Sequence, residues 1–231
     1  MKSLVLIGEG HGEVTALPVL VRRLLRERDP AGLLFVDDDM IRAREAASLI
    51  RWDRQKNQAD CEEWLRKVKL AARRSNLGGI LAVFDGDSRV FPAGTSSAFC
   101  AATAAKLMAR AATEAGAGRI FSLAVVFACA EYETWLIAGT ESLAGKSFRD
   151  GRPVLPRGLE FPAGNPESHG KGWLEKHCPG YRPTRDQCPL TELVDLSVVR
   201  AKKLRSFVRL ENALDQLLAA AGEGCFIATP A

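Results

Sequence analysis

The segment from Gly79 to Phe84 is apolar at every position and ends abruptly at Asp85. A short run of this kind is typical of a strand buried on both faces, as the central strands of parallel sheets are. Further apolar runs at Leu4–Gly8, Leu33–Val36 and Ile120–Cys129 alternate with stretches in which apolar residues recur at helical spacing. Strands that alternate with helices form βαβ units. The pattern therefore predicts an α/β fold with a mainly parallel, Rossmann-like sheet flanked by helices.

Helices are expected between the predicted strands and after them. Thr15 is a candidate cap for the first helix, and Pro18 would then fall in its first turn, where proline is tolerated. A short helix should begin at Glu131, and another lies around Lys171–His177. Apolar residues at helical spacing predict longer helices over about Val14–Leu25, Cys61–Val68, Ser97–Ala115 and Leu196–Ala220.

From Gly139 to Thr191 the chain is rich in Gly and Pro and has poor periodicity. The aromatic residues Phe161, Trp173 and Tyr181 in this stretch need a core in which to bury their rings. We therefore expect an α/β core over residues 1–140. A loop-rich and helical C-terminal elaboration over residues 141–231 should pack on that core and end in a long helix.

The composition is that of an ordinary globular protein, with 47% hydrophobic and 26% charged residues. No apolar run reaches the roughly 18 residues that a membrane-spanning helix needs, and the apolar stretch after Met1 is too short for a signal peptide. We therefore expect a cytoplasmic protein with no membrane partner. The six cysteines include no C-x-x-C pair, which favours buried thiols over disulfides or a zinc site. The net charge of +4 is by itself weak evidence for a nucleic-acid partner.

Acidic residues follow three of the predicted strands directly. Glu9 follows the first strand, Asp85 and Asp87 follow the central strand, and Glu131 and Glu133 follow the strand that ends at Cys129. The carboxyl ends of parallel strands meet at one edge of a sheet, where ligand sites form. Carboxylate oxygens are the ligands that Mg²⁺ and Mn²⁺ prefer. The spacing therefore predicts a shared Mg²⁺ or Mn²⁺ site at this edge.

The loop around Glu9 has the sequence Gly-Glu-Gly-His-Gly-Glu and precedes a helix. Gly10 and His11 are candidates for binding a phosphate, because glycines allow close backbone approach and a helix N-terminus attracts anions. The alternatives are a simple tight turn and an exposed loop histidine. No Lys-Ser/Thr pair follows, so this loop is not a P-loop, and an ATP-dependent activity within this chain is disfavoured.

Two further features each allow a functional and a structural interpretation. Glu131 lies nearest the strand end and is the better candidate to reach the metal, but glutamates in the first turn of a helix are also favoured by the helix dipole. His169 and His177 have no second metal-type partner at useful spacing and are taken as structural or surface residues.

Basic residues gather near the start of the last helix. Such a charged helix face is often only solvated, but Lys and Arg contacts to phosphates also dominate nucleic-acid affinity. Arg89, just after the aspartates, is a candidate for steadying a phosphate. The candidate phosphate-binding wall consists of Lys202, Lys203, Arg205 and Arg209, with Arg200 beside them.

A strand followed by Glu-Gly and a helix, and then a strand ending in Asp-x-Asp, resembles the Toprim fold of topoisomerases, primases, small maturation ribonucleases and OLD-type nucleases. In that family the first glutamate is a metal ligand or general acid/base, and the paired aspartates bind the metal. The resemblance therefore implies these roles for Glu9 and for Asp85 and Asp87, respectively. Glu13 matches an acidic position that OLD-type relatives often carry, which makes it a further candidate ligand.

The chain is also similar to a bacterial Toprim-like family often encoded beside ATPases in defence loci. Val83–Arg89, Ala128–Leu136 and Lys171–Leu214 carry this similarity, and His11 departs from it, because many relatives have a small residue or proline there. The resemblance implies a Mg²⁺-dependent phosphodiesterase, a DNA or RNA nuclease subunit that acts with an ATPase in anti-phage defence and that could form a homo-oligomer. The alternatives are a non-catalytic or weakly active subunit that docks on the ATPase, and a small-molecule phosphotransferase.

Overall fold

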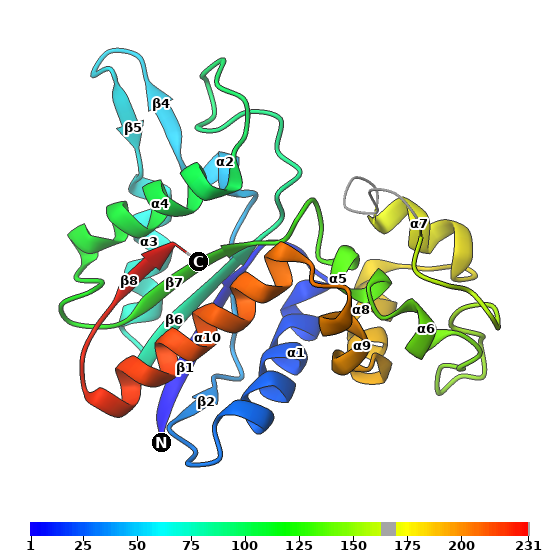
Figure 1. The fold of residues 1–231 in the computed structure, drawn as a ribbon. Coiled ribbons are helices and arrows are strands. Elements are labelled where there is room, and N and C mark those ends of the chain that lie inside the picture. Colours follow the sequence, from blue (N-terminus) through cyan, green and yellow to red (C-terminus); the bar gives the residue numbers. More distant parts are fainter. Residues whose placement is uncertain (163–169, 231) are drawn as a thin grey trace.

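One parallel sheet forms the centre of the protein in the computed structural model, which describes residues 1–162 and 170–230 (Figure 1). Its strand order is β2-β1-β6-β7-β8, and β3 pairs with the end of β1 beyond β2. Every pairing in this sheet is parallel, which confirms the predicted α/β class. The strands are β1 (Lys2–Gly8), β2 (Leu34–Val36), β3 (Ile41–Arg42), β6 (Leu77–Phe84), β7 (Leu123–Phe127) and β8 (Ala228–Pro230).

Helices cover both faces of the sheet, and a hairpin stands apart from it. The hairpin consists of β4 (Arg51–Asp53) and β5 (Gln58–Asp60). The helices are α1 (Glu13–Arg28), α2 (Ala46–Leu49), α3 (Glu62–Ala72), α4 (Ala101–Ala112), α5 (Glu133–Ile137), α6 (Thr140–Leu143), α7 (Gly170–His177), α8 (Pro183–Leu193), α9 (Leu196–Ala201) and α10 (Arg205–Glu223).

The strands are apolar throughout because both faces of the sheet are buried. In β1, Leu4 and Leu6 point into the core that contains α1 and α10, whereas Val5 and Ile7 point into the core that contains α3 and α4. The β6 and β7 side chains alternate between the same two cores. The sheet is therefore wound on both sides, with two hydrophobic layers.

The chain changes direction across the sheet between β1 and β6. From β1 it first builds outward through β2, and it then returns to the other side of β1 to form β6, β7 and β8. Ligand sites in sheets of this kind lie at such a switch point, outside the carboxyl ends of the strands. Because β1 ends at Gly8 and β6 ends at Phe84, Glu9 and Asp85 both lie there.

Several predicted helix boundaries were wrong, each for a local reason. The N-cap of α1 is Gly12, not Thr15, whose hydroxyl donates to the Gly12 carbonyl oxygen over 3.0 Å, and Pro18 lies beyond the first turn. The alanine-rich helix α4 begins only at Ala101, after a loop that leaves the sheet.

The last helix, predicted to be continuous from Leu196 to Ala220, is broken in two. A turn at Lys202–Leu204 separates α9 from α10, and Lys203 adopts a left-handed φ of 54° within it. Apolar spacing continues across the turn, so the sequence pattern does not reveal the break.

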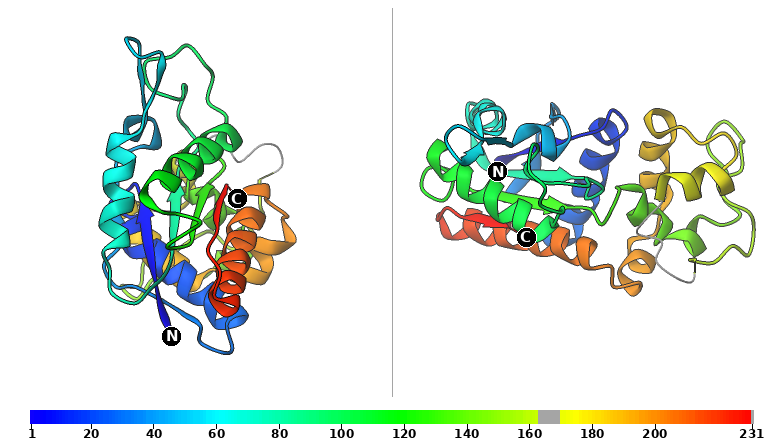
Figure 2. Two further views of the ribbon diagram at one scale, coloured as in Figure 1. Left: turned by 90° about the vertical axis from the view of Figure 1, so that its left-hand side faces the viewer. Right: turned by 90° about the horizontal axis from the view of Figure 1, so that it is seen from above.

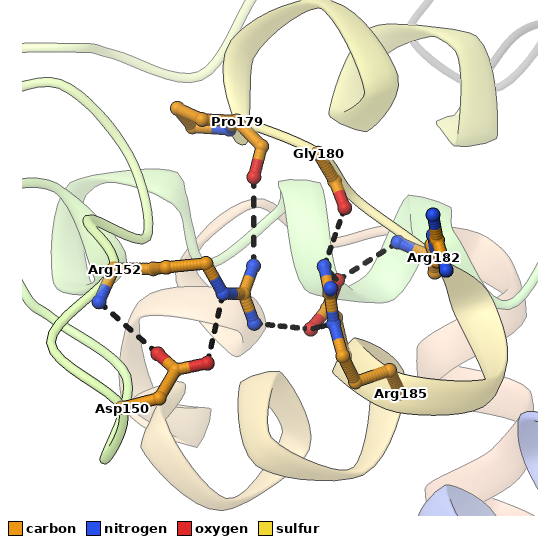
Figure 3. Close-up of polar contacts among 7 residues, drawn as sticks. Asp150, Arg152, Pro179, Gly180, Arg182 and Arg185 are labelled. Carbon is orange, nitrogen blue, oxygen red and sulfur yellow. Dashed lines mark hydrogen bonds and ion pairs between the residues drawn. The ribbon is translucent and has the colours of Figure 1, made fainter.

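The C-terminal helices α5–α9 gather at the end of the sheet where the strands terminate (Figure 2). The buried carboxylate of Asp186 in α8 joins the segment between α6 and α7 to α8, because it accepts hydrogen bonds from Arg152 over 2.8 Å and from Arg185 of α8 itself over 2.7 Å. Figure 3 shows both guanidinium groups reaching this carboxylate, with Arg152 also bound to Asp150. Burial alone would raise the pKa of Asp186, but the hydrogen bonds from Arg185 and Arg152 hold it below its usual value.

The division at residue 140 does not separate two hydrophobic cores. Leu210, Leu214 and Leu217 of α10 pack in the same core as Leu4 and Leu81 of the sheet. Residues after 140 also contribute β8, which pairs with β7. The C-terminal segment therefore completes the sheet and one of its layers, in addition to forming the helical end.

The structure bears on the expectation that no helix spans a membrane and on the expectation that the cysteines are buried. Within residues 1–162 and 170–230, none of the helices combines the length and apolar character needed to cross a membrane. Cys178 is a buried free thiol, whereas Cys100 and Cys225 are free thiols on the surface. The prediction that the cysteines are buried is therefore wrong for those two, and Cys61, Cys129 and Cys188 are only half-buried.

Candidate functional site

Glu9 connects the ends of the two central strands. Its Oε1 accepts a hydrogen bond from the backbone N–H of Asp85 over 3.0 Å and a longer one from Ala46, at the start of α2, over 3.4 Å. The side chain is partly buried between these segments. Glu9 and Asp85, predicted to share a site, are thus brought together.

Glu13 folds back over the loop that precedes α1. Its side chain is buried, and Oε2 accepts a hydrogen bond from the backbone N–H of Glu9 over 3.2 Å. A Cβ atom placed on Gly10 would lie 2.8 Å from Glu13 Oε1. The glycine therefore makes room for this carboxylate, and the space over Gly10 that the phosphate interpretation requires already holds an acidic group.

Asp85 is anchored to the segment that follows β7. Its Oδ1 accepts a hydrogen bond from the backbone N–H of Tyr132 over 2.9 Å, and the N–H of Gly86 donates to the carbonyl of Ala130 over 2.8 Å. Asp87, two residues further on, is exposed and lines the same cavity as Asp85. The three carboxylates predicted at the first two strand ends, and Glu13 with them, therefore line one cavity.

The glutamates after β7 differ from expectation. Glu131 Oε2 accepts a hydrogen bond from the backbone N–H of Lys171 in α7 over 2.7 Å, because Ala130 has a left-handed φ of 57° that turns the chain before α5 begins. Glu133 is buried instead, and its charge raises the pKa of both Asp85 and Glu13. The glutamate that acts electrostatically on the site is therefore Glu133.

Two donors, one just before α8 and one within it, hold Glu133 in place. Tyr181 Oη and Gln187 Nε2 each donate a hydrogen bond to Glu133 Oε1 over 2.9 Å. The sequence analysis ranked Glu131 ahead of Glu133 as the glutamate expected to reach the metal, because Glu131 is nearer the strand end. The left-handed residue that reverses this order carries no sequence signal, because it is an alanine.

Burial and mutual repulsion make these carboxyl groups hold their protons unusually tightly. Burial, repulsion from Glu13 and a smaller repulsion from Asp87 raise the pKa of Glu9 to about 8. Burial, with repulsion from Glu133 and Asp87, raises the pKa of Glu13 to about 7. The pKa of Asp85 is raised well above its ordinary value, by burial and then by repulsion from Glu13 and Glu9. The cluster is an environment that favours an added positive charge.

The carboxylate oxygens of the cluster are of the kind that bind divalent cations. In their present orientations, however, these side chains do not form a metal-binding site. In the described part of the chain, no Lys or Arg forms an ion pair with Glu9, Glu13, Asp85, Asp87 or Glu133. Among the same residues, no three His, Cys, Asp or Glu side chains form a group that could hold a metal ion. Carboxylates now bonded to backbone N–H groups would have to turn toward one another to bind one.

Two arginines that the sequence analysis overlooked line the same cavity as the carboxylates. The cavity has a volume of about 510 Å³, and Arg42 and Arg44 form part of its wall. Arg42 Nη1 donates to His11 Nδ1 over 3.2 Å, so the exposed histidine faces this wall. These arginines reach the site because the two-residue strand β3 pairs with the last residues of β1, a pairing too short to detect from sequence.

The basic residues predicted to bind phosphate lie elsewhere. Lys202 forms an ion pair with Glu141, and Arg200 forms ion pairs with Glu27 and Glu211. The remaining candidates, Arg89, Lys203, Arg205 and Arg209, are not among the residues that line the carboxylate cavity.

Of the two other histidines, the structure describes only His177. His177 in α7 packs against Trp173, with ring centroids 4.5 Å apart, which agrees with a structural role. His169 lies outside the described residues.

One protein family matches most of the chain. The model of the family described as Domain of unknown function (DUF4276) matches residues 8–215, which include every acidic residue of the site. No curated protein and no solved structure matches the chain.

Proposed function

Because the chain belongs to the DUF4276 family, a domain of unknown function, we propose its activity from its own site: a Mg²⁺- or Mn²⁺-dependent phosphodiesterase that cleaves DNA or RNA. The observation that carries the proposal is the gathering of Glu9, Glu13, Asp85 and Asp87 at the switch point between β1 and β6. Buried acids without a counter-charge are costly to maintain, and a divalent cation would offset that cost.

The atoms that the cluster offers to a metal are carboxylate oxygens, which hard cations such as Mg²⁺ prefer. Glu9, Asp85 and Asp87 are the residues we propose to hold it, with Glu13 in support, and all of them offer carboxylate oxygens. Such a cation supplies Lewis-acid polarisation and charge neutralisation at a phosphate oxygen. Glu131, bonded to α7, is the least suited of the five sequence candidates, and Glu133 takes its place as the acidic neighbour.

The remaining residues of the cavity suit a phosphodiester. Arg42 and Arg44 bring guanidinium groups, which bind phosphate oxygens in a forked geometry, to the wall beside the carboxylates. Glu9, with a pKa of about 8, can hold a proton at Oε at neutral pH. A divalent cation held by this carboxylate would displace that proton.

The resemblance to Toprim proteins supports the same activity through the positions of Glu9, Asp85 and Asp87. On that resemblance we also propose that the protein acts in the bacterial cytoplasm together with an ATPase, in defence against phage. Nucleic acid is the proposed substrate, and the ATPase is the proposed protein partner.

Cleavage of labelled DNA and RNA by the purified protein in Mg²⁺ or Mn²⁺, with and without the neighbouring ATPase, tests this function. We expect Asp85→Asn to lower the rate by at least about 100-fold, because removing a group that stabilises transition-state charge costs about 3 kcal/mol or more. Asn retains an acceptor for the Tyr132 N–H, so the fold should persist.

Asp38→Asn is the matched control, since Asp38 is an exposed aspartate outside the cavity. It should cleave at the wild-type rate. Cleavage by Asp85→Asn at the wild-type rate would contradict the proposed site, and the absence of cleavage under every condition would contradict the function.

A further inference from the structure

A chain of cavities leads away from the carboxylates along α3. The cavity that holds Glu9 and Asp85 shares Arg44 and Ser48 with a second cavity of about 290 Å³. A third cavity, of about 700 Å³, lies between α3 and the β4–β5 hairpin. The second and third cavities share four lining residues, Asp60, Glu62, Arg66 and Lys67. Because they share lining residues, the three cavities lie in a row from the candidate active site to the hairpin, and we call this row the groove.

The groove carries cations whose charge is available. Arg44 and Arg51 are exposed along its first half, and Lys69 and Arg73 are exposed along its second half. In the described part of the chain, none of these four side chains forms an ion pair. They are therefore free to contact an anionic ligand.

Much of the acidic charge in the groove is already engaged by neighbouring groups. Glu63 pairs with Arg66 over 2.8 Å, and Asp53 pairs with Lys56 over 3.5 Å. Asp60 accepts a hydrogen bond from the backbone N–H of Glu62 over 3.0 Å, at the start of α3. Glu62 and Glu114 also line the second and third cavities and, like Asp60, form no ion pair in the described part of the chain. The unpaired cations of these two cavities, which are Arg44, Arg51, Lys67, Lys69 and Arg73, outnumber these three acids.

The outer wall of the groove is tied to the segment that carries Asp87. Trp52 in β4 donates its backbone N–H to the Ala93 carbonyl over 2.7 Å, and Ala93 donates to Ile50 over 3.1 Å. Ala93 lies on the loop between β6 and α4, which begins with the site aspartates. Figure 1 shows this loop and the hairpin projecting together from the same end of the molecule.

We propose that this groove binds an extended polynucleotide strand, whose phosphates pass from the carboxylate cavity along Arg44 and Arg51 to Lys69. The proposal rests on the proposed phosphodiesterase function and names its substrate as a polymer, not a mononucleotide or a small phosphate ester. Cations spaced along a groove suit a ligand with repeated charges, because each contact with the backbone adds affinity without requiring a particular base. Lys203, Arg205 and Arg209 line none of the three cavities, so the basic start of α10 is not this path.

Binding of labelled single-stranded oligonucleotides to full-length Asp85→Asn protein tests the groove while cleavage is suppressed. Strands of about 4 and about 20 nucleotides bracket the length that a groove of this kind covers. We expect Arg51→Ala combined with Lys69→Ala to weaken binding of the longer strand about tenfold. The double change should also lower the salt slope of binding by about 1.4, that is, about 0.7 for each lost phosphate contact.

Lys203→Ala combined with Arg205→Ala is the matched control, because it removes the same charge from exposed positions outside the groove. Its affinity and salt slope should equal those of the Asp85→Asn parent. Equal loss in the control pair, or loss only in the control pair, would overturn the groove. So would binding of both strands with the same affinity in the parent protein.

The same variants separate this inference from the proposed function. Suppose that the wild-type protein cleaves nucleic acid and that the double variant Arg51→Ala and Lys69→Ala, with Asp85 intact, cleaves long strands equally well. The proposed groove is then wrong, and the proposed phosphodiesterase activity stands. Suppose instead that neither the wild-type protein nor any variant cleaves nucleic acid, and that the double variant Arg51→Ala and Lys69→Ala loses binding of the long strand while the control variant does not. The groove then stands as a binding surface, and the proposed phosphodiesterase activity is wrong.

Discussion

Glu9 and Glu13 hold protons near neutral pH because burial and neighbouring acids raise the pKa of Glu9 to about 8 and that of Glu13 to about 7. Both carboxyl groups have an ordinary value of 4.5, which the unfolded chain should show. Between these values the folded protein binds more protons than the unfolded chain. The stability contributed by these protons is fully present below pH 4.5 and is lost as the pH rises through the folded-state pKa values.

In metal-free buffer with a chelator, the free energy of unfolding should therefore fall as the pH rises from about 5 to about 8. A fall of about 3–6 kcal/mol is expected, since one pKa unit corresponds to about 1.4 kcal/mol and the interaction between the two groups makes their contributions less than additive. Urea unfolding at a series of pH values measures it. The variant Glu13→Gln should flatten the profile, whereas a wild-type profile that is level or rises over this interval would show that the folded-state pKa values of Glu9 and Glu13 are not raised.

The sequence identified Glu9, Asp85 and Asp87 because these residues follow strands whose apolar character is unmistakable, and Glu13 because it matches an acidic position of OLD-type nucleases. Arg42 and Arg44 could not be found in the same way, since a two-residue strand gives no periodic pattern. Glu133 was named in the sequence but placed second to Glu131. Only the backbone turn at Ala130 decides between them.

At the scale of elements, the packing of α8 against the start of α1 positions Glu13. A Cβ atom on Gly12 would lie 2.7 Å from the Pro183 carbonyl oxygen and closer still to the Gln187 side chain. The carbonyl belongs to the α8 backbone and cannot turn away as a side chain can. Gly12 is therefore required by the close approach of the two helices.

We expect Gly12→Ala to lower the free energy of unfolding by about 1–3 kcal/mol, the usual effect of adding a methyl group to a closely packed interface. Gly172→Ala is the matched control, because a Cβ on this exposed helical glycine meets nothing within 4 Å. It should be neutral or slightly stabilising. Thermal unfolding compares the two variants, and equal melting temperatures would argue against the close packing of α1 and α8.

The elements that escaped prediction are those whose stabilising contacts come from distant residues. β6 is apolar throughout and could be placed from sequence, but the hairpin strands β4 and β5 have three residues each and are largely polar. In α8 the buried face includes Asp186, Gln187 and Thr191, so its polar residues conceal the apolar period of a helix. Such elements depend on hydrogen bonds to other parts of the chain, which local patterns do not record.

At the scale of the whole molecule, the strand order brings the chemistry together. Glu9 and Asp85 are far apart in the chain, yet β1 and β6 are neighbours at the switch point of the sheet. Tyr181 just before α8 and Gln187 within it hold Glu133 in place, so the acidic cluster depends on both halves of the chain. The α/β class could be predicted from alternating patterns, but this convergence depends on the strand order.

The central claim is that these carboxylates hold a divalent cation, and diffraction from crystals soaked in Mn²⁺, measured at the manganese absorption edge, tests it most directly. We expect an anomalous peak between the ends of β1 and β6, within about 2.3 Å of carboxylate oxygens of Glu9 and Asp85. The peak should be absent from crystals of Asp85→Asn and retained in Asp38→Asn. Wild-type crystals with no manganese at this position, or with manganese bound only elsewhere, would contradict the account.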